Sequence, residues 1–396
     1  MAIPIKYNLR NLKLRKGLTI MTALGIALTV TTAVFLMALL AGLDRAFIQS
    51  GDAKNVLVLR KGSQAELSGG FDASLFPTLR ELPGIAKDSH GEPMASGEWV
   101  VVIVLPRKDG TGEVNVSVRG MMQDGVELRE QPKEGSKNPG VKLVEGRWFA
   151  PGQREVVVGR NIHSRFSGTN VGDTLDFGKG KWTVVGIFDA GGTAYDSEIW
   201  SDVNQMAPDF DRTGGYSSAY LRATDPVAAD ALKNRVSDDQ RLKLEGSLET
   251  EYFAKQTSSG GPIKYVGIVV AVIMAIGSIF AAMNTMYAAV AYRGREIATL
   301  RVIGFSRPSI LTSFVFESLA LSLLGAVIGI LLMLPFNGMT TGIGNSLTFS
   351  EMVFSLQLTW RVALYAILFG VIMGVLGGLA PAWHAARQNI LNALRS

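Results

Sequence analysis

The sequence contains no cysteine, which excludes disulfide bonds, thiolate-bound metals and a lipid-modified N-terminal cysteine. Its three histidines stand far apart, and none has a partner at the spacing of metal ligands. The GxSxG motif of serine hydrolases and the HExxH motif of zinc proteases are both missing. The segment GKGKWT at 178–183 lacks the preceding glycine that a phosphate-binding loop needs. We therefore expect no catalytic residues, no metal site and no ATP-binding site in this chain.

Charge is also scarce in four long stretches. Leu18–Leu43 has no charged residue, Tyr265–Tyr292 has none, and Glu317 is the single charge in the third stretch. About 20 apolar residues are enough to cross a bilayer as a helix. We therefore expect four transmembrane helices, near 18–43, 265–292, 309–334 and 362–383.

The first apolar stretch has two possible readings, a cleaved signal peptide or a membrane anchor. Its apolar core is roughly twice as long as that of a signal peptide, which favours an uncleaved anchor. Before it, residues 1–17 combine apolar residues at helical spacing with lysines and arginines on the adjoining stripe. This pattern indicates either a cytoplasmic amphipathic helix on the inner leaflet or a merely charged flank.

The distribution of charge predicts the orientation of the chain. The N-terminal segment, the connection after the second span and the tail 384–396 together hold 11 basic residues and one acid, Glu296. Basic segments stay in the cytoplasm. We therefore expect a multi-pass protein of the bacterial cytoplasmic (inner) membrane, with both termini on the cytoplasmic side. Segment 44–262, with 26 basic and 31 acidic residues, is expected outside, as is the loop 335–361. The formal net charge of +5 thus reflects topology and does not indicate nucleic-acid binding.

Segment 44–262 predicts a mixed α+β domain inserted between the first two spans. A strand, a helix and a strand within 55–106 open it, and the same order within 216–249 closes it. We expect these two ends to form one compact lobe. Between them, at about 114–200, short apolar runs separated by glycines indicate a mostly β insertion.

The connection Arg293–Arg307 places five charges between two apolar runs. It predicts a short amphipathic helix that ends near Gly304. Two interpretations are open: a charged turn that only satisfies topology, or a helix that docks into a groove on a cytoplasmic partner. Glu296, an acid on a surface that otherwise carries bases, favours docking. The apolar side of the helix is expected to hold Ile297, Leu300 and Ile303.

Polar residues and glycines inside the spans carry further expectations. Glu317 lies roughly 14 Å into the bilayer at helical rise, where a carboxyl needs a partner. We favour a structural hydrogen bond to another span over a direct conformational or substrate role. Asn284 is expected to form an interhelical hydrogen bond worth about 1 kcal/mol. Glycines at four-residue spacing allow close helix packing, either within the chain or between two copies: Gly325, Gly329, Gly370, Gly374 and Gly378.

Several segments resemble one known family. MNTMYAAVAYRGREIATLRVIGFSR (283–307) resembles the second-span and coupling-helix signature of MacB/FtsX/LolC-type (type VII) ABC transporter permeases. ESLALSLLGAVIGILLMLP (317–335) is similar to their third span, and PAWHAARQNILNALRS (381–396) to their C-terminal ending. VKLVEGRWFAPGQREVVVG (141–159) is similar to the MacB-like periplasmic core. Small departures are Ala298 and Ile390 at positions where Gly and Pro are commoner, and an enlarged loop at Thr340–Ser350.

The resemblance implies an α-helical membrane protein with four transmembrane helices and a large extracytoplasmic α+β domain between helices 1 and 2. It implies pairing with a second permease copy or a sister permease, contact with membrane lipid, and a separate cytoplasmic ABC ATPase that binds ATP and magnesium. A periplasmic adaptor and an outer-membrane channel are further possible partners. The ATPase-coupling role carries over to Arg295, Glu296, Ile297, Leu300, Arg301 and Gly304.

The function that the resemblance implies first is export. ATPase movements would be relayed to the extracytoplasmic domain to expel an amphipathic compound, a peptide or a lipid-like substrate. An FtsX-like relay that regulates an external hydrolase and a LolC-like extraction of lipoproteins are the alternatives. In each case the chain itself is not an enzyme, because ATP is hydrolysed by a separate subunit.

Overall fold

The computed structural model describes residues 16–132, 140–258, 261–344 and 348–387. The helix expected over 1–17 and the tail expected over 384–396 lie mostly outside these residues. The chain divides into two compact units. We call them the membrane unit, with Met1–Ala41, Pro262–Met339 and Leu356–Ser396, and the inserted domain, with Gly42–Gly261 and Thr340–Ser355.

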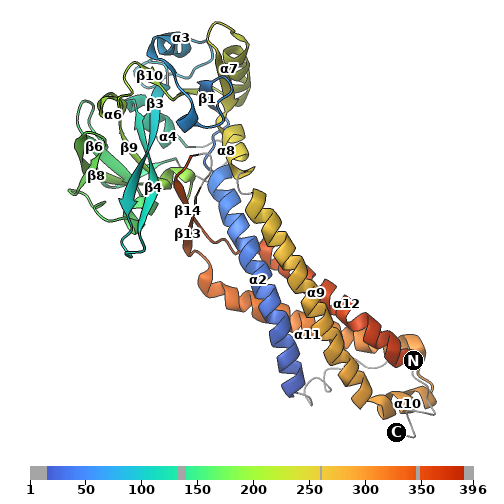
Figure 1. Ribbon diagram of the computed structural model, residues 1–396. Helices are drawn as coiled ribbons and strands as arrows, with labels where there is room; N and C mark the ends of the chain where they lie inside the picture. Colours follow the sequence, from blue (N-terminus) through green and yellow to red (C-terminus); the bar gives the residue numbers. More distant parts are fainter. Residues whose placement is uncertain (1–15, 133–139, 259–260, 345–347, 388–396) are drawn as a thin grey trace. The chain divides into compact units, whose positions relative to one another are not determined.

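Four helices in the described residues are long and apolar enough to cross a membrane (Figure 1). Helices satisfy their backbone hydrogen bonds internally, which is the condition for crossing lipid. The expected four spans are thus confirmed. The four helices are α2 (Lys16–Ile48), α9 (Gly261–Tyr292), α11 (Arg307–Met333) and α12 (Trp360–Arg387).

The first helix is longer than its uncharged stretch predicts. It continues through Asp44 and Arg45 to Ile48. Both charged side chains are exposed, whereas the next two residues, Ala46 and Phe47, are buried. The last turns of α2 are therefore amphipathic, with one exposed and one buried side. The helix continues beyond the point where the apolar stretch stops.

The described residues of the membrane unit also form two short elements. α10 (Gly294–Val302) connects α9 to α11 (Figure 1). The 3-10 helix η4 (Leu334–Phe336) follows α11 directly. α11 and α12 pack against each other over much of their length.

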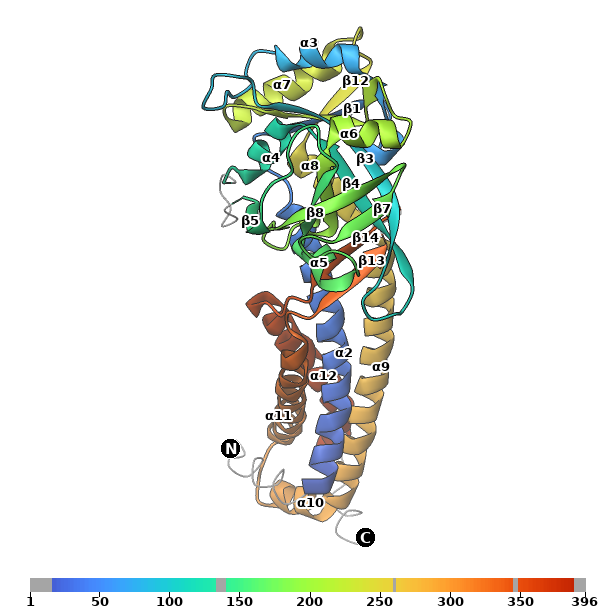
Figure 2. The same ribbon diagram turned by 90° about the vertical axis from the view of Figure 1, so that its left-hand side faces the viewer.

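The inserted domain is built on one ten-stranded sheet (Figure 2). Nine of its strands follow the order β12-β1-β11-β3-β4-β9-β6-β8-β5, and β7 pairs with β8. The strands of this sheet are β1 (Asn55–Arg60), β3 (Ala95–Pro106), β4 (Glu113–Met121), β5 (Lys142–Gly146), β6 (Glu155–Gly159), β7 (Thr174–Phe177), β8 (Gly180–Asp189), β9 (Glu198–Asp202), β11 (Ser218–Arg222) and β12 (Leu244–Leu248). β2 (Phe71–Asp72) and β10 (Gly215–Tyr216) form a separate pair.

Short helices lie between these strands and after the last of them. They are η1 (Glu66–Ser68), η2 (Ala73–Leu75), α3 (Phe76–Arg80), α4 (Gln123–Glu130), α5 (Arg160–Arg165), η3 (Ala194–Ser197), α6 (Val203–Asp209), α7 (Pro226–Asp238) and α8 (Glu249–Ser258). α7 has a well-defined start, because Asp225 accepts a hydrogen bond from the backbone N–H of Ala228 and Pro226 occupies the first turn.

Two hydrophobic cores share the sheet. α3 and α7 cover β1, β11 and β12, which come from the two ends of the inserted segment, so the expected α+β lobe is present. β4, β6, β7, β8 and β9 form the second core with α5 and α6. The two parts are joined by one long strand: β3 pairs with β11 through Ala95–Glu98 and with β4 through Trp99–Pro106. The β-rich segment 114–200 therefore extends the sheet of the lobe.

The loop expected over 335–361 contains a β-hairpin, β13 (Thr340–Gly344) and β14 (Glu351–Ser355). β13 and β14 are labelled in Figure 2. β14 contacts β4 and η3, and its first four residues are buried. Although it lies between the third and fourth spans in sequence, this hairpin groups with the inserted domain.

Candidate functional site

Helix α10 has a well-defined C-terminal end. Gly304 adopts a left-handed conformation with φ of 106°, which a residue with a side chain rarely adopts. Its N–H lies 3.2 Å from the Arg301 carbonyl oxygen, and the Phe305 N–H lies 3.1 Å from that of Leu300. These two bonds are the pair that terminates helices at a glycine. The chain is thus turned sharply from α10 into α11.

A buried ion pair fixes the start of α10. The Arg293 side chain, 6% exposed, donates from Nη1 to Glu317 Oε2 of α11 at 2.9 Å. Its Nε donates to Glu296 Oε2 at 3.1 Å, and its guanidinium lies over the Phe314 ring, 5.1 Å from the centroid. Arg293 therefore links the connection to the third span. Glu317 was expected to bond to another span, but its partner Arg293 lies in the connection, between the end of α9 and the start of α10.

The inward side of α10 agrees with the apolar side expected from the sequence, except at Ile303. Ile297 and Ala298 are buried, and Leu300 and Arg301 are partly buried, as an inward face requires. Ile303 follows the helix and is 65% exposed, as is Val302, so the predicted apolar stripe is wrong at its last member. The reason is that the helix ends at Val302, which breaks the helical period. The exposed side holds Arg295, Glu296, Thr299, Val302 and Ile303.

Asn284 does not form the expected interhelical hydrogen bond within the described part of the chain. It lies on an exposed face of α9, the span with the smallest buried share of the four. A single polar residue in an apolar stretch does not indicate which face of the helix will pack against the other helices.

The glycines lie at contacts between helices of the same chain. A Cβ on Gly325 or Gly329 would come within 2.9 Å or less of a backbone carbonyl oxygen of α2. A Cβ on Gly370, Gly374 or Gly378 would come within 2.8 Å or less of side chains of α11. Of the two readings left open by the sequence, the structure therefore places these five glycines in packing within the chain.

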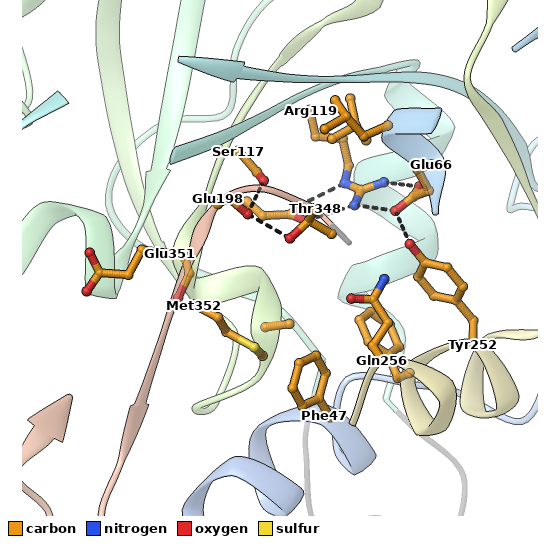
Figure 3. Close-up of a pocket in the computed structure, with 16 residues that line it drawn as sticks. Phe47, Glu66, Ser117, Arg119, Glu198, Tyr252, Gln256, Thr348, Glu351 and Met352 are labelled. Atoms are coloured by element: carbon orange, nitrogen blue, oxygen red, sulfur yellow. Dashed lines mark hydrogen bonds and ion pairs between the residues drawn. The ribbon is translucent and has the colours of Figure 1, made fainter. Parts of the chain in front are cut away.

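A second buried cluster of charged residues, besides that of Arg293 in the membrane unit, lies in the inserted domain around Arg119 of β4 (Figure 3). Its guanidinium lies 2.6 Å from Glu66, 2.9 Å from Glu98 and 2.8 Å from Glu198. Arg129 of α4 contacts the same Glu98 at 2.7 Å. Burial alone would raise the pKa of Glu66, but the charge and hydrogen bonds of Arg119 hold it below its ordinary value. The cluster is therefore a network in which each of three carboxylates contacts an arginine.

A cavity of about 50 Å³ adjoins this cluster. Its lining includes Phe47 at the end of α2, Tyr252 and Gln256 of α8, and Thr348 and Met352 of the hairpin (Figure 3). A drug-sized ligand needs a pocket of about 300 Å³ or more, so this space suits water. In the described ranges no group of three histidine or acidic residues is arranged to hold a metal ion.

A buried carboxyl in η3 gives the inserted domain a pH dependence. Asp196 accepts hydrogen bonds from the backbone N–H groups of Ala190 at 2.6 Å and Gly192 at 2.7 Å. Burial raises the pKa of Asp196 from 3.8 to about 6, although both hydrogen bonds oppose this rise. The folded state thus binds this proton more tightly than the unfolded state. Stability contributed by the proton is present at low pH and is lost as the pH rises through 6.

Raising the pH from 5 to 7.5 should therefore lower the free energy of unfolding by about 1 kcal/mol through Asp196. The Asp196→Asn variant should be less stable overall, because the amide accepts only one backbone bond well, but should lack this part of the slope. Thermal unfolding of the full chain in detergent, followed by tryptophan fluorescence at both pH values, measures the difference. Equal slopes for the two proteins would contradict the assignment.

Sequence reasoning missed Arg293 as a site residue and missed the hairpin altogether. The signal for Arg293 was the lone carboxyl of Glu317, which requires a cation, but several arginines of the connection were equally near in sequence. The hairpin had no comparable signal, because its contacts are with segments that are far away in the sequence.

Two family models together match almost the whole described chain. The MacB-like periplasmic core domain matches residues 19–239, and the FtsX-like permease C-terminal domain matches residues 268–390. The second match covers α10 and the helices on either side of it.

Similar proteins come from bacteria and archaea. The ABC transporter permease MJ1507 of Methanocaldococcus jannaschii is 23% identical over 99% of this chain and 97% of its own length. The ABC transporter permease YknZ of Bacillus subtilis is 24% identical over 99% of this chain and 98% of its own. The macrolide export ATP-binding/permease protein MacB of Pasteurella multocida is 24% identical over 95% of this chain, which spans 57% of that longer protein.

Proposed function

The chain belongs to the family of ABC transporter permeases with a MacB-like periplasmic core and an FtsX-like permease domain, and on that premise we propose that it is the membrane subunit of an ATP-driven export system. Membership of this family implies a partner ATPase. In our proposal that separate subunit binds ATP and magnesium on the cytoplasmic side of the inner membrane. The inserted domain lies on the opposite side, and the chain works with a second permease copy or a sister permease.

The observation that carries the proposal is the construction of α10. The helix is held by a buried ion pair and a glycine turn, while its other side presents Glu296, Val302 and Ile303 to solvent. Exposed aliphatic side chains beside charges suit a partner protein surface better than a free one. We propose that the ATPase docks on this side and that Arg293–Glu317 passes its movement into α11. Of the proposed coupling residues, Arg295 and Glu296 lie on the docking side. Ile297, Leu300 and Arg301 lie on the inward side of the helix, and Gly304 ends it.

The transported substrate in this proposal is an amphipathic compound, a peptide or a lipid-like molecule, passed on through a periplasmic adaptor. The support is the name of the relative MacB, a macrolide exporter, and the matched core domain. Export predicts that such a compound stimulates the ATPase activity of the complex. Regulation of an external hydrolase predicts a bound enzyme and no stimulation.

Mass spectrometry of the tagged full chain, purified from its native membrane in mild detergent, tests the docking. We expect an ABC ATPase to co-purify with the wild type and to fall at least tenfold with Glu296→Lys or Ile303→Asp. The lysine reverses the charge of the exposed acid, and the aspartate places a charge in an apolar contact.

The matched control is Val227→Asp, since Val227 is an exposed aliphatic residue of α7 in the inserted domain. This variant should retain the ATPase. If no ATPase accompanies the wild type, the proposed function is wrong. If Ile303→Asp and Glu296→Lys retain it, the docking side has been misassigned.

A further inference from the structure

The hairpin β13–β14 is joined by the chain to two membrane helices, yet it groups with the inserted domain. The backbone of β14 forms hydrogen bonds with side chains of that domain. Val353 donates its N–H to Ser197 Oγ of η3 at 3.0 Å, and its carbonyl oxygen accepts from Asn161 Nδ2 of α5 at 3.2 Å. Ser350 Oγ lies 2.9 Å from Ser117 Oγ of β4. Three elements of the domain thus hold one strand.

A buried carboxylate anchors the same strand. Glu351 is 6% exposed and pairs with Arg107, which follows β3. Arg165 at the end of α5 places Nη2 3.1 Å from Glu351 Oε1. A carboxylate that is nearly excluded from water persists only with such cationic partners, so undocking would expose two arginines and one acid to separate solvation.

The chain just before β14 adopts a costly conformation. Phe349 has a left-handed φ of 51°, which a bulky residue rarely adopts. Its carbonyl oxygen accepts a hydrogen bond from Asn115 Nδ2 at 2.8 Å. Strained backbone of this kind persists where surrounding contacts determine it, which indicates that the docked position of the hairpin is specific.

The residues that flank the hairpin in sequence are also hydrogen-bonded, within the membrane unit. Leu356 donates its N–H to the Met339 carbonyl oxygen at 2.9 Å, and Gly338 donates to the Leu356 carbonyl oxygen at 2.9 Å. Gln357 donates its N–H to the Ala38 carbonyl oxygen of α2 at 3.1 Å. η4 ends only two residues before Gly338, so the chain between α11 and the hairpin has little slack.

We propose that this hairpin is a third mechanical connection between the membrane helices and the inserted domain, beside α2 and the passage from α8 to α9. Displacement of α11 and α12 is delivered through β14 to β4 and η3, and Glu351 is the positioning residue that keeps the hairpin docked. The inference rests on the proposed function, because the displacement is driven by the partner ATPase.

Hydrogen exchange of the full chain, in its native complex with the ATPase, tests the connection with and without trapping by ATP and vanadate. In the wild type, trapping should change exchange both in α10 and in β4 and η3. Glu351→Ala should keep the change in α10 and lose most of the change in β4 and η3. Glu113→Ala, which removes an exposed carboxyl from the start of β4, should behave like the wild type.

The absence of native cysteine provides a rescue. Ser117→Cys combined with Ser350→Cys places two thiols where the hydroxyls meet, and their disulfide fastens the hairpin to β4. Oxidation should restore the response of β4 and η3 in the Glu351→Ala background and leave it intact in the wild-type background. Glu351→Gln serves in the same experiment if the alanine variant does not accumulate.

A full response of β4 and η3 in the Glu351 variants would overturn the proposal, and so would loss of the wild-type response when the disulfide forms, since the hairpin would then have to undock. Failure of the wild type to respond even in α10 has a different meaning. It would overturn the proposed function, and the connection with it.

Discussion

Replacing Arg293 with methionine should lower the free energy of unfolding of the membrane unit by about 4 kcal/mol. Methionine keeps the apolar length of the side chain but leaves the Glu317 carboxylate buried without its 2.9 Å partner. Removing one member of a buried ion pair typically costs 3–5 kcal/mol because the other charge is left uncompensated. Thermal unfolding of the full chain in detergent measures the loss, and the same purification should show less bound ATPase.

Two companion variants make this result specific. Arg295→Met removes an exposed arginine two residues away and should change stability by less than about 0.5 kcal/mol. Arg293→Met combined with Glu317→Leu removes both charges and should recover most of the lost stability, because an apolar pair avoids the desolvation cost. Equal losses for Arg293→Met and Arg295→Met, or no recovery in the double variant, would contradict the ion pair as described.

Gly325→Leu should separate α2 from α11 and reduce the stability of the membrane unit by about 3 kcal/mol or more. A Cβ at this position would lie 2.8 Å from the Ile26 side chain and 2.9 Å from the Ala23 carbonyl oxygen. A backbone oxygen cannot rotate away as a flexible side chain can, so the helices must shift. The amount of folded protein in detergent and its midpoint of thermal unfolding measure the effect.

Gly277→Leu is the matched control, since Gly277 also lies within a span but has no atom within 4 Å of an added Cβ. Both substitutions improve helix propensity to a similar extent, so any difference between them reports packing. We expect Gly277→Leu to leave the monomer unchanged in stability or slightly more stable. Destabilisation of the same size at both positions would show that glycine matters for a reason other than the contact with α2.

Local features of the sequence determined the architecture in outline. Uncharged stretches of sufficient length specify spans whatever surrounds them, because the cost of leaving apolar side chains in water accumulates residue by residue. Alternating apolar residues and turn residues likewise predicted strands and a helix at the two ends of the inserted segment, where β1, β11 and α7 lie. The end of α10 at Gly304 was predictable for the same reason, since the left-handed turn depends on that residue alone.

The tertiary structure alone decided which residues meet. The need of Glu317 for a partner is local, but the choice of Arg293 among nearby arginines depends on how α10 packs against α11. Gly325 allows any helix to approach closely, and the tertiary structure decides that this helix is α2. Glu351 is paired by Arg107 and Arg165, which are more than 180 residues away in sequence. Such pairings depend on the closure of long loops and on mutual burial, and no short stretch of sequence encodes either.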